Sequence, residues 1–314
     1  MKNLFKTKKV KKLIPGENGN EIEVEVVKQS SAKIAKNVIY YVFGAILSLF
    51  FLFPLIYMLA VSTKSDSSIA ASAGTLGMFL PDFKNLGAMF ANYKKLFVEY
   101  QIGKYALNSI RYAIIVIVLN VIINGLAGYV LAKFRIPGKR FFTFIILFLI
   151  VVPVETSIVP LYMIVKQMLH LKGVASILGI IMPATISVFN MFLFMQFFQG
   201  IPKDYEEAAR IDGAGNLAIF FKIILPLSKP IVATVAVFCF IGVWNDYLWP
   251  TMVLVNYPDL MPIQSALTTI QSIEGITTGE VMASLVITSI PIFIVYVAAQ
   301  KYIVQGFGTA GLKV

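Results

Sequence analysis

The residue types that usually carry enzyme chemistry are scarce in this chain of 314 residues. It contains one cysteine, Cys239, and one histidine, His170, so neither a disulfide framework nor a Cys/His metal cluster is expected. The carboxylates are scattered, and no phosphate loop of the form Gly-x-x-x-x-Gly-Lys-Ser/Thr occurs. The chain is therefore not expected to hydrolyse ATP by the usual P-loop chemistry, to hold a metal or cofactor, or to contain catalytic residues.

One segment of unusual composition lies between two apolar stretches, from Gln199 to Lys229. It reads QGIPKDYEEAARIDGAGNLAIFFKIILPLSK and is much longer than a simple connection needs to be. Asp204 and Glu207 have the spacing of an acidic capping box, with Asp204 as the N-cap. Gly213 is placed to end the helix in the left-handed conformation.

These signals predict a short helix from Tyr205 to Asp212, followed by a turn at 214–216. A second, more apolar helical stretch is expected from Leu217 to Leu225, ended by Pro226. The small side chains of Ala208 and Ala209 would let the first helix approach another protein closely. The alternative is a surface helix that rests on the membrane interface. The candidate partner-binding residues are Asp204, Tyr205, Glu206, Glu207, Ala208, Ala209, Arg210, Asp212, Gly213 and Pro226.

The composition shows which kind of scaffold carries this segment. Hydrophobic residues make up 58% of the chain and charged residues only 14%, and the mean hydropathy is +0.80. A soluble protein needs more polar surface, so the chain is expected to be an integral membrane protein. The net charge of +11 does not indicate nucleic acid, because nine lysines precede residue 37; we expect a solvated, partly disordered basic arm near anionic lipid.

An all-α fold with six membrane-spanning helices is expected, because a span needs about 20 mostly apolar residues in helical form. Both termini are expected on the cytoplasmic side, since most short gaps rich in Lys and Arg then face inward. The expected parts are a cytoplasmic extension at 1–37, a permease domain at 38–303 with the loop 199–229, and a tail at 304–314. The expected spans are 38–62, 106–131, 141–164, 174–198, 230–256 and 280–303.

Several polar or aromatic residues lie within the expected spans. Pro153 and Pro160 bracket Glu155, which indicates irregular backbone beside a solvent path. A carboxylate in lipid is costly, so Glu155 and Asp246 either line a cavity or have a structural role between helices or at the interface. Trp244 fits a sugar path, a lipid belt or helix packing equally well. The candidate path residues are Glu155, Asn190, Gln196, Trp244, Asn245 and Asp246.

The loop segment resembles the signature of bacterial ABC importer permeases. Glu207-Ala208-Ala209, three residues, Gly213, nine residues, Ile223, one residue and Leu225-Pro226 match that signature without gaps. Further motifs are similar to the carbohydrate branch, the MalG-type subunits of maltose-like systems, from about residue 38 to the end. They are Asn108-Ser109, Pro153 with Pro160-Leu161, the run from Trp244 to Pro250, and Gln305-Gly306 with Thr309-Ala310-Gly311.

The resemblance implies a permease in a bacterial cell membrane that takes up a sugar or oligosaccharide. It implies that the short helix is a coupling helix docking on a separate cytoplasmic ATPase, which binds ATP and Mg²⁺. The implied partners are a homologous second permease subunit, two ATPase copies and an extracytoplasmic solute-binding protein. The resemblance also implies that the gap 257–279 reaches the binding protein, with Tyr257, Asp259, Gln264 and Gln271 as candidate contacts, and that the C-terminal tail inserts between the ATPases.

Three alternatives remain open from the residues alone. An importer of the same kind could carry a non-sugar solute such as glycerol phosphate, for which Arg111 would be the main cationic candidate. An ion-coupled secondary transporter should show inverted repeats, and no convincing internal symmetry is visible. An intramembrane enzyme would need a catalytic constellation that the sequence does not contain.

Overall fold

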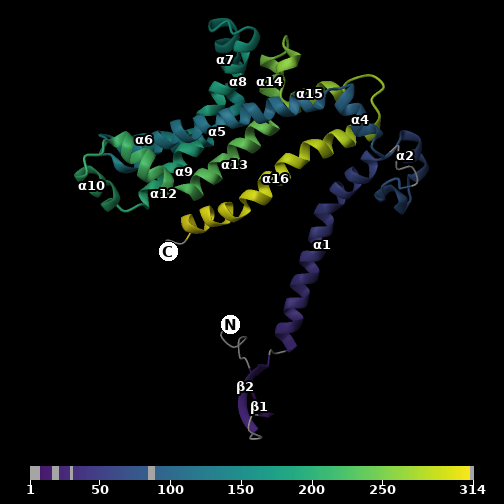
Figure 1. The fold of residues 1–314 in the computed structure, drawn as a ribbon, viewed down its shortest axis with the longest axis horizontal. Coiled ribbons are helices and arrows are strands. Elements are labelled where there is room, and N and C mark those ends of the chain that lie inside the picture. Colours follow the sequence, from purple (N-terminus) through teal and green to yellow (C-terminus); the bar gives the residue numbers. More distant parts are fainter. Residues whose placement is uncertain (1–7, 16–20, 29–30, 84–88, 312–314) are drawn as a thin grey trace. The chain divides into compact units, whose positions relative to one another are not determined.

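A computed structural model describes the backbone of residues 8–15, 21–28, 31–83 and 89–311, and side chains within 36–83 and 89–301 (Figure 1). The chain divides into two units, residues 1–59 and 60–314. The elements are β1 Lys8–Pro15, β2 Glu21–Lys28, α1 Ser31–Ser62, α2 Asp66–Ser72, η1 Leu76–Phe79, α4 Ala91–Val98, α5 Ile102–Lys133, α6 Lys139–Val151, η2 Val154–Ser157, α7 Ile158–Met163, η3 Ile164–Met168, η4 Gly173–Ala175, α8 Ser176–Thr185, α9 Val188–Gln199, α10 Asp204–Ile211, α11 Asn216–Ile219, η5 Phe220–Ile224, α12 Leu225–Leu227, α13 Lys229–Asn245, α14 Leu248–Val253, η6 Pro258–Leu260, α15 Ile263–Gln271 and α16 Thr278–Gly311.

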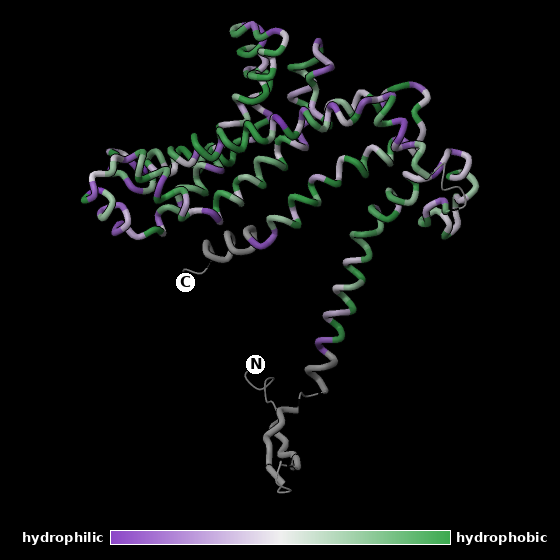
Figure 2. The backbone as a smooth tube through the Cα atoms, in the orientation of Figure 1, coloured by the Kyte–Doolittle hydropathy of each residue, from purple (hydrophilic) through white to green (hydrophobic). Residues whose placement is uncertain are grey.

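The first unit consists of β1, β2 and most of α1. The strands pair antiparallel, with Lys8 opposite Lys28 and Pro15 opposite Glu21. The expectation of an all-α chain is therefore wrong at the N-terminus. The many lysines there were interpreted as a solvated arm, and the two strands were not predicted. The helix α1 begins at Ser31, within the expected extension 1–37, and its part that is apolar enough to cross a membrane begins at Lys36. Residues 1–7, 16–20 and 29–30 of the extension lie outside the described part. The described side chains of α1 are mostly exposed. Most of its residues are hydrophobic (Figure 2).

Three helices among the described residues are long and apolar enough to cross a membrane unbroken. They are Lys36–Ser62, Ile102–Lys133 and Thr278–Lys301, which agrees with the first, second and sixth expected spans. Three further spans are possible if each of three bent helix pairs counts as one. The bent pairs are Lys139–Val151 with Val154–Met168 at 93°, Gly173–Thr185 with Val188–Gln199 at 44°, and Asn216–Leu227 with Lys229–Asn245 at 85°.

The breaks have identifiable local causes. Pro153 ends the regular backbone after α6, as the proline pattern indicated, because proline cannot donate to the preceding turn. Between α8 and α9 the Asn124 side chain replaces the missing helical bonds. It donates to Thr185 O at 2.8 Å and accepts from the Ser187 N–H at 3.0 Å. The polar groups freed by the bend are thereby satisfied inside the protein, as a membrane segment requires.

The second unit is built around α5, which packs against α8, α9, α13 and α15 (Figure 1). Gly128 allows the closest approach, since a Cβ there would lie 2.7 Å from Phe194 Cβ and 2.9 Å from Met195 N. Near the C-terminal end of α5 the ring of Tyr129 contacts Phe198 and Phe220. The tight packing makes α5 the axis of this unit, with α10 near one end and α4 and α15 near the other.

The last helix continues beyond the expected span. The sequence predicted a span at 280–303 and a separate tail from 304, whereas the helical backbone of α16 runs to Gly311. The side chains of residues 302–314 lie outside the described part of the chain. The expected glycine-rich tail motif therefore falls on helical backbone, and its contacts stay untested.

Candidate functional site

The short helix α10 spans Asp204–Ile211, one residue earlier at each end than the sequence indicated. The capping box is wrong, since Lys203 is the N-cap and no side chain bonds there. Asp204 instead lies in the first turn, where a negative charge favours the helix dipole. The first free amides are satisfied by the backbone, because the Glu206 and Glu207 N–H groups both donate to Lys203 O.

The end of α10 matches the expectation. Gly213 has a φ of +81°, the left-handed conformation that glycine adopts without strain. The Ala214 N–H donates to Ala209 O at 2.9 Å, and the Gly213 N–H donates to Arg210 O at 3.0 Å. These two bonds form a Schellman motif. The Arg210 side chain secures the following turn by donating to Asn216 Oδ1 at 2.7 Å.

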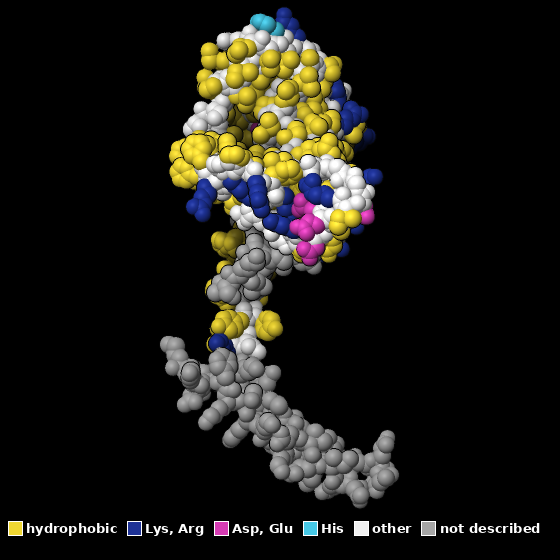
Figure 3. Space-filling model, turned by 90° about the vertical axis from the view of Figure 1, so that its left-hand side faces the viewer, with side chains coloured by type: hydrophobic (Ala, Val, Ile, Leu, Met, Phe, Trp, Pro, Cys, Tyr) yellow, Lys and Arg dark blue, Asp and Glu magenta, His cyan; other side chains and the backbone are white. Residues whose placement is uncertain are grey.

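The two faces of α10 differ in their surroundings. Ala209 and Glu206 are buried, with 7% exposure each. The other described residues of the helix and its stop are exposed, and Ile211 is 87% exposed. Figure 3 shows acidic and basic side chains gathered on the face that includes this end of the unit, beside a broad apolar surface. The exposed face thus combines charge with isolated apolar side chains, as protein contact surfaces often do.

Glu206 attaches α10 to α5. Its Oε1 lies 3.2 Å from Lys133 Nζ, and its Oε2 accepts from the Tyr129 hydroxyl at 3.2 Å. Lys133 also donates to Ile201 O at 2.6 Å, just before the helix. Both charged side chains are more than 90% buried, and a buried ion pair is strongly disrupted when one partner is lost. We name Glu206, Lys133 and Tyr129 the inner clamp.

The stretch after the turn differs from the expected single helix. It consists of α11, a π-helical turn η5 and α12. Pro226 does not end it after Leu225, as predicted, because the helical backbone continues without a break to Leu227. The chain turns at Ser228, whose hydroxyl donates to Ile224 O at 2.6 Å, before α13 begins.

A second set of polar contacts joins the other end of α5 to the loop before α15. Asn108 Nδ2 donates to Asp259 O at 3.0 Å and Met261 O at 3.1 Å. The Tyr112 hydroxyl donates to Leu260 O at 2.8 Å, and Ser109 Oγ accepts from the Ile263 N–H at 2.8 Å. We name Asn108, Ser109 and Tyr112 the outer clamp. Every one of its bonds goes to a backbone group between Asp259 and Ile263, so the clamp fixes the course of the chain into α15.

The outer clamp supports a stability prediction. Ser109→Ala is expected to lower the free energy of unfolding by about 1–3 kcal/mol, because the buried Ile263 N–H loses its acceptor. Lys104→Ala removes an exposed ion pair with Asp259 and should cost less than about 1 kcal/mol. Thermal unfolding of both variants in detergent, with hydrogen exchange at 257–263, checks this. Equal effects of the two variants would contradict the clamp.

Two of the four candidate binding-protein contacts, Tyr257 and Asp259, lie on this clamped loop, and the other two, Gln264 and Gln271, lie on α15, which follows it. Asp259 is exposed and pairs with Lys104. Tyr257 is half-buried beneath Lys166, whose ammonium lies 5.7 Å from the ring centroid. Gln264 is half-buried and Gln271 exposed on α15, whose apolar side is buried in the unit. At the same end, a hydrogen bond from Lys95 to Glu280 at 2.8 Å raises the pKa of Lys95.

Two of the candidate path residues, Trp244 and Asn190, are buried and make hydrogen bonds within the chain. Trp244 is fully buried, stacks on Phe240 and donates to Thr288 O at 3.0 Å. Asn190 is buried and donates to Asn120 Oδ1 at 3.0 Å. Of the three alternatives for Trp244 (a sugar path, a lipid belt or helix packing), its contacts correspond to packing between helices. Glu155, Gln196 and Asn245 are exposed on η2, α9 and the end of α13.

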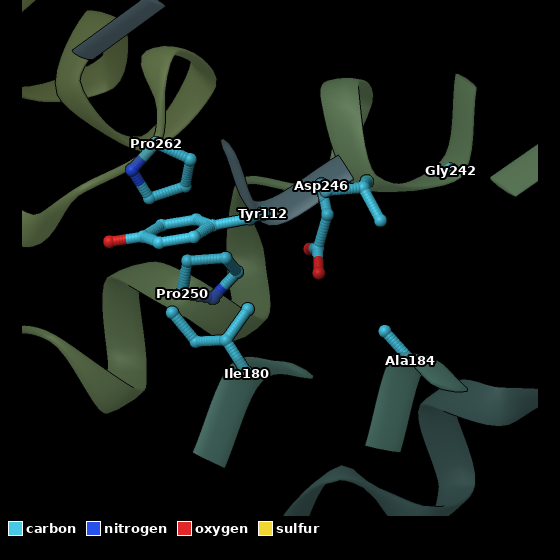
Figure 4. A pocket seen from close by; sticks show the side chains of 8 residues that line it. Tyr112, Ile180, Ala184, Gly242, Asp246, Pro250 and Pro262 are labelled. Carbon is cyan, nitrogen blue, oxygen red and sulfur yellow. The ribbon is translucent and has the colours of Figure 1, made fainter. Parts of the chain in front are cut away.

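Asp246 is the candidate that faces a cavity. It lies in the break between α13 and α14, half-buried, and its Oδ1 accepts from the Trp249 N–H at 3.4 Å. The cavity has a volume of about 60 Å³, large enough for water molecules. Figure 4 shows the ring of Tyr112 between Pro250 and Pro262, and the Asp246 carboxylate pointing into the space toward Ala184.

Sequence reasoning missed Tyr129, Lys133 and Tyr112. Lys133 lies in one of the gaps rich in Lys and Arg that indicated only orientation, although a lysine at the end of an apolar helix and an acidic segment later in the chain are both visible in the sequence. Their pairing depends on how α5 and α10 pack. The described residues contain no group of three His, Cys, Asp or Glu that could hold a metal ion.

Comparison with known proteins yields a family and several relatives. The family model of the binding-protein-dependent transport system inner membrane component matches residues 124–309. The arabinooligosaccharides transport system permease protein AraQ of Halalkalibacterium halodurans is 31% identical over 264 residues, 83% of this chain and 91% of the relative. The diacetylchitobiose uptake system permease protein NgcG of Streptomyces coelicolor is 32% identical over 253 residues, 80% of each chain.

Two further similarities involve anionic compounds. The sn-glycerol-3-phosphate transport system permease protein UgpE of Yersinia pestis is 34% identical over 206 residues, 65% of this chain and 72% of the relative. Among solved structures, a bacterial ABC transporter involved in the import of the acidic polysaccharide alginate contains a similar chain. It has a TM-score of 0.75 and 27% identity, and the match covers 88% of this chain and 99% of that one.

Proposed function

This chain belongs to the family of binding-protein-dependent transport system inner membrane components, and we propose that it moves an oligosaccharide across a bacterial cell membrane. The observation that carries the proposal is α10: a charged, exposed helix, ended by Gly213 and attached to α5 by a buried ion pair. Its exposed face has the character of a docking surface for a separate ATPase. That subunit would bind ATP and Mg²⁺, since the chain has no phosphate loop of its own.

The proposed topology has six spans, with the three bent helix pairs each counted as one and both termini inside. The positions of basic residues support this orientation. The proposed assembly holds this chain, a homologous second permease, two ATPases and an extracytoplasmic binding protein. The chain itself is then not an enzyme but the membrane part of an ATP-driven machine.

The mechanism follows from the two clamps on one helix. The inner clamp ties α10 to the C-terminal end of α5, and the outer clamp ties the loop before α15 to its N-terminal end. Because α5 is a single helix of 32 residues, movement of α10 with a closing ATPase would shift both ends together. Such a switch works only if the ATPase binds the two arrangements with different free energies.

An oligosaccharide is the proposed cargo because the two relatives with the fuller coverage are permeases of arabinooligosaccharide and diacetylchitobiose systems. The glycerol-3-phosphate relative supports a second candidate, a phosphorylated solute. Purification of the tagged chain with its companions, followed by reconstitution in vesicles, tests the proposal. Saccharide uptake that requires internal ATP is expected; uptake driven by an ion gradient without ATP would refute it.

A further inference from the structure

A hollow at the outer end of the second unit has the features of a sugar site. It has a volume of about 620 Å³ and is walled by the start of α5, the end of α14, η6 and α15. The volume lies within the range of small-molecule sites. We propose that this hollow binds an uncharged saccharide unit on its way to the membrane path, an inference that rests on the proposed function. The polar and aromatic lining residues are Glu99, Tyr100, Gln101, Tyr105, Thr251 and Thr269.

The lining matches the two-sided chemistry of a sugar ring. A sugar presents C–H faces, which pack on aromatic rings, and a rim of hydroxyls, which need hydrogen-bond partners. Tyr100 and Tyr105 supply rings, and the remaining wall is largely aliphatic. Gln101 and Thr251 supply an amide and a hydroxyl, each able both to donate and to accept. A few polar groups in a mostly apolar hollow are typical of sites that orient one ligand.

The charges around the hollow favour a neutral ligand. Its lining contains the carboxylate of Glu99 and, among the described residues, no Lys or Arg. Of the basic residues on the adjoining elements, Lys95 pairs with Glu280 while its ammonium lies 5.6 Å from the ring centroid of the lining Tyr100, and Lys104 pairs with Asp259. An anionic sugar or a phosphate would need cationic partners and would meet a carboxylate instead.

The position of the hollow connects it with the cavity at Asp246. Tyr105 lines the hollow and Tyr112 the cavity; they lie two turns apart on α5, about 10 Å along its axis. Two pairs of neighbouring residues also connect the two spaces. Met261 lines the hollow and Pro262 lines the cavity; likewise, Thr251 lines the hollow and Pro250 lines the cavity. Cargo released by a binding protein would therefore meet the hollow before the Pro250–Tyr112–Pro262 stack that lines the cavity (Figure 4).

A pair of neighbouring substitutions tests the site. Thr269→Trp places an indole in the hollow, whereas Thr268→Trp adds the same bulk on the adjacent exposed residue, which does not line it. Saturation-transfer difference NMR on the detergent-purified permease–ATPase complex uses arabinotriose, diacetylchitobiose and an alginate trisaccharide as probes. We expect signals from a neutral probe with the wild type and Thr268→Trp, their loss with Thr269→Trp, and none from the alginate probe.

The outcomes separate this inference from the proposed function. In vesicles with the binding protein, Thr269→Trp should raise the half-saturating saccharide concentration about tenfold, whereas Thr268→Trp should leave both this concentration and basal ATP hydrolysis unchanged. Equal behaviour of the two Trp variants, or a strong alginate signal, overturns the inference while import continues. The inference is also overturned if Thr269→Trp weakens the affinity for the binding protein but leaves saccharide binding unchanged. The hollow would then be a contact site for the binding protein and not for the saccharide. A wild-type complex that imports no saccharide refutes the proposed function itself.

Discussion

Glu206→Ala is expected to lower ATP-driven uptake by more than about 100-fold, since breaking a buried ion pair costs about 3–5 kcal/mol. The substitution leaves the ammonium of Lys133 buried without its carboxylate and removes the acceptor of the Tyr129 hydroxyl. The helix α10 would then lose its attachment to α5, so that movement of the ATPase no longer reaches the spans. Uptake into vesicles and ATP hydrolysis, measured on the same preparation, check the prediction.

A double substitution supplies the control for this prediction. Removing both charges of a buried pair is far less costly than removing one, so Glu206→Gln combined with Lys133→Met should recover much of the stability lost in Glu206→Ala. Membrane insertion should be normal in all variants. Full coupling between hydrolysis and uptake in Glu206→Ala would show that the inner clamp does not transmit movement.

Gly213→Val is expected to reduce uptake about tenfold and weaken association with the ATPase, since an L-residue in the left-handed conformation costs about 1–2 kcal/mol. A Cβ at Gly213 would meet nothing within 4 Å, so the cost comes from the backbone and not from a clash. With φ of +81°, a β-branched residue is especially unfavourable. The Schellman motif would open and the exposed face of α10 would change direction. Copurification of the ATPase and uptake assays measure the effect.

Gly215 provides a matched control two residues away. It has a φ of −75°, and a Cβ there also meets nothing within 4 Å, so Gly215→Val should be tolerated. Gly213→Asn should be milder than Gly213→Val, because asparagine enters the left-handed region more readily. Equal loss in Gly215→Val and Gly213→Val would mean that bulk at the contact surface, and not backbone conformation, is responsible.

Local signals in the sequence were enough to predict α10. The acidic residues of the first turn and the left-handed stop at Gly213 act within a few residues of the chain, so a short sequence window contains both signals. The observed helix differs from the predicted one by one residue at each end. The capping box failed because backbone bonds to Lys203 already satisfy the first amides. Pro226 was interpreted as the stop of the second helical stretch, whereas the helical backbone continues to Leu227, two residues beyond the predicted end.

Contacts between distant segments could not be predicted in this way. The partners of Glu206 lie more than 70 residues earlier in the chain, and the packing of α5 against α9, the helix before α10, brings the two segments close together. The bend between α8 and α9 likewise depends on the amide of Asn124 in another helix. Hydropathy identified the apolar stretches correctly but carried no information on bends of 44° to 93° within them.

The candidate path shows the same limit. Composition selects polar residues within spans, but it cannot say which of them face a cavity. Trp244 is buried against Phe240, while Asp246, two residues on, faces the small cavity because α13 ends between them. The aromatic residue that lines this cavity, Tyr112, was not selected, because a tyrosine in an apolar helix has no distinguishing pattern.

Cross-linking from the exposed face of α10 tests the central claim most directly. In a Cys239→Ser background, Ile211→Cys presents a thiol at a site that is 87% exposed in this chain, and Gln271→Cys presents one at the end of α15. We predict that a short bis-maleimide links Ile211→Cys to the ATPase, and that a membrane-impermeant maleimide added to intact cells labels only Gln271→Cys. External labelling of Ile211→Cys, or no cross-link to an ATPase that copurifies, would contradict the account.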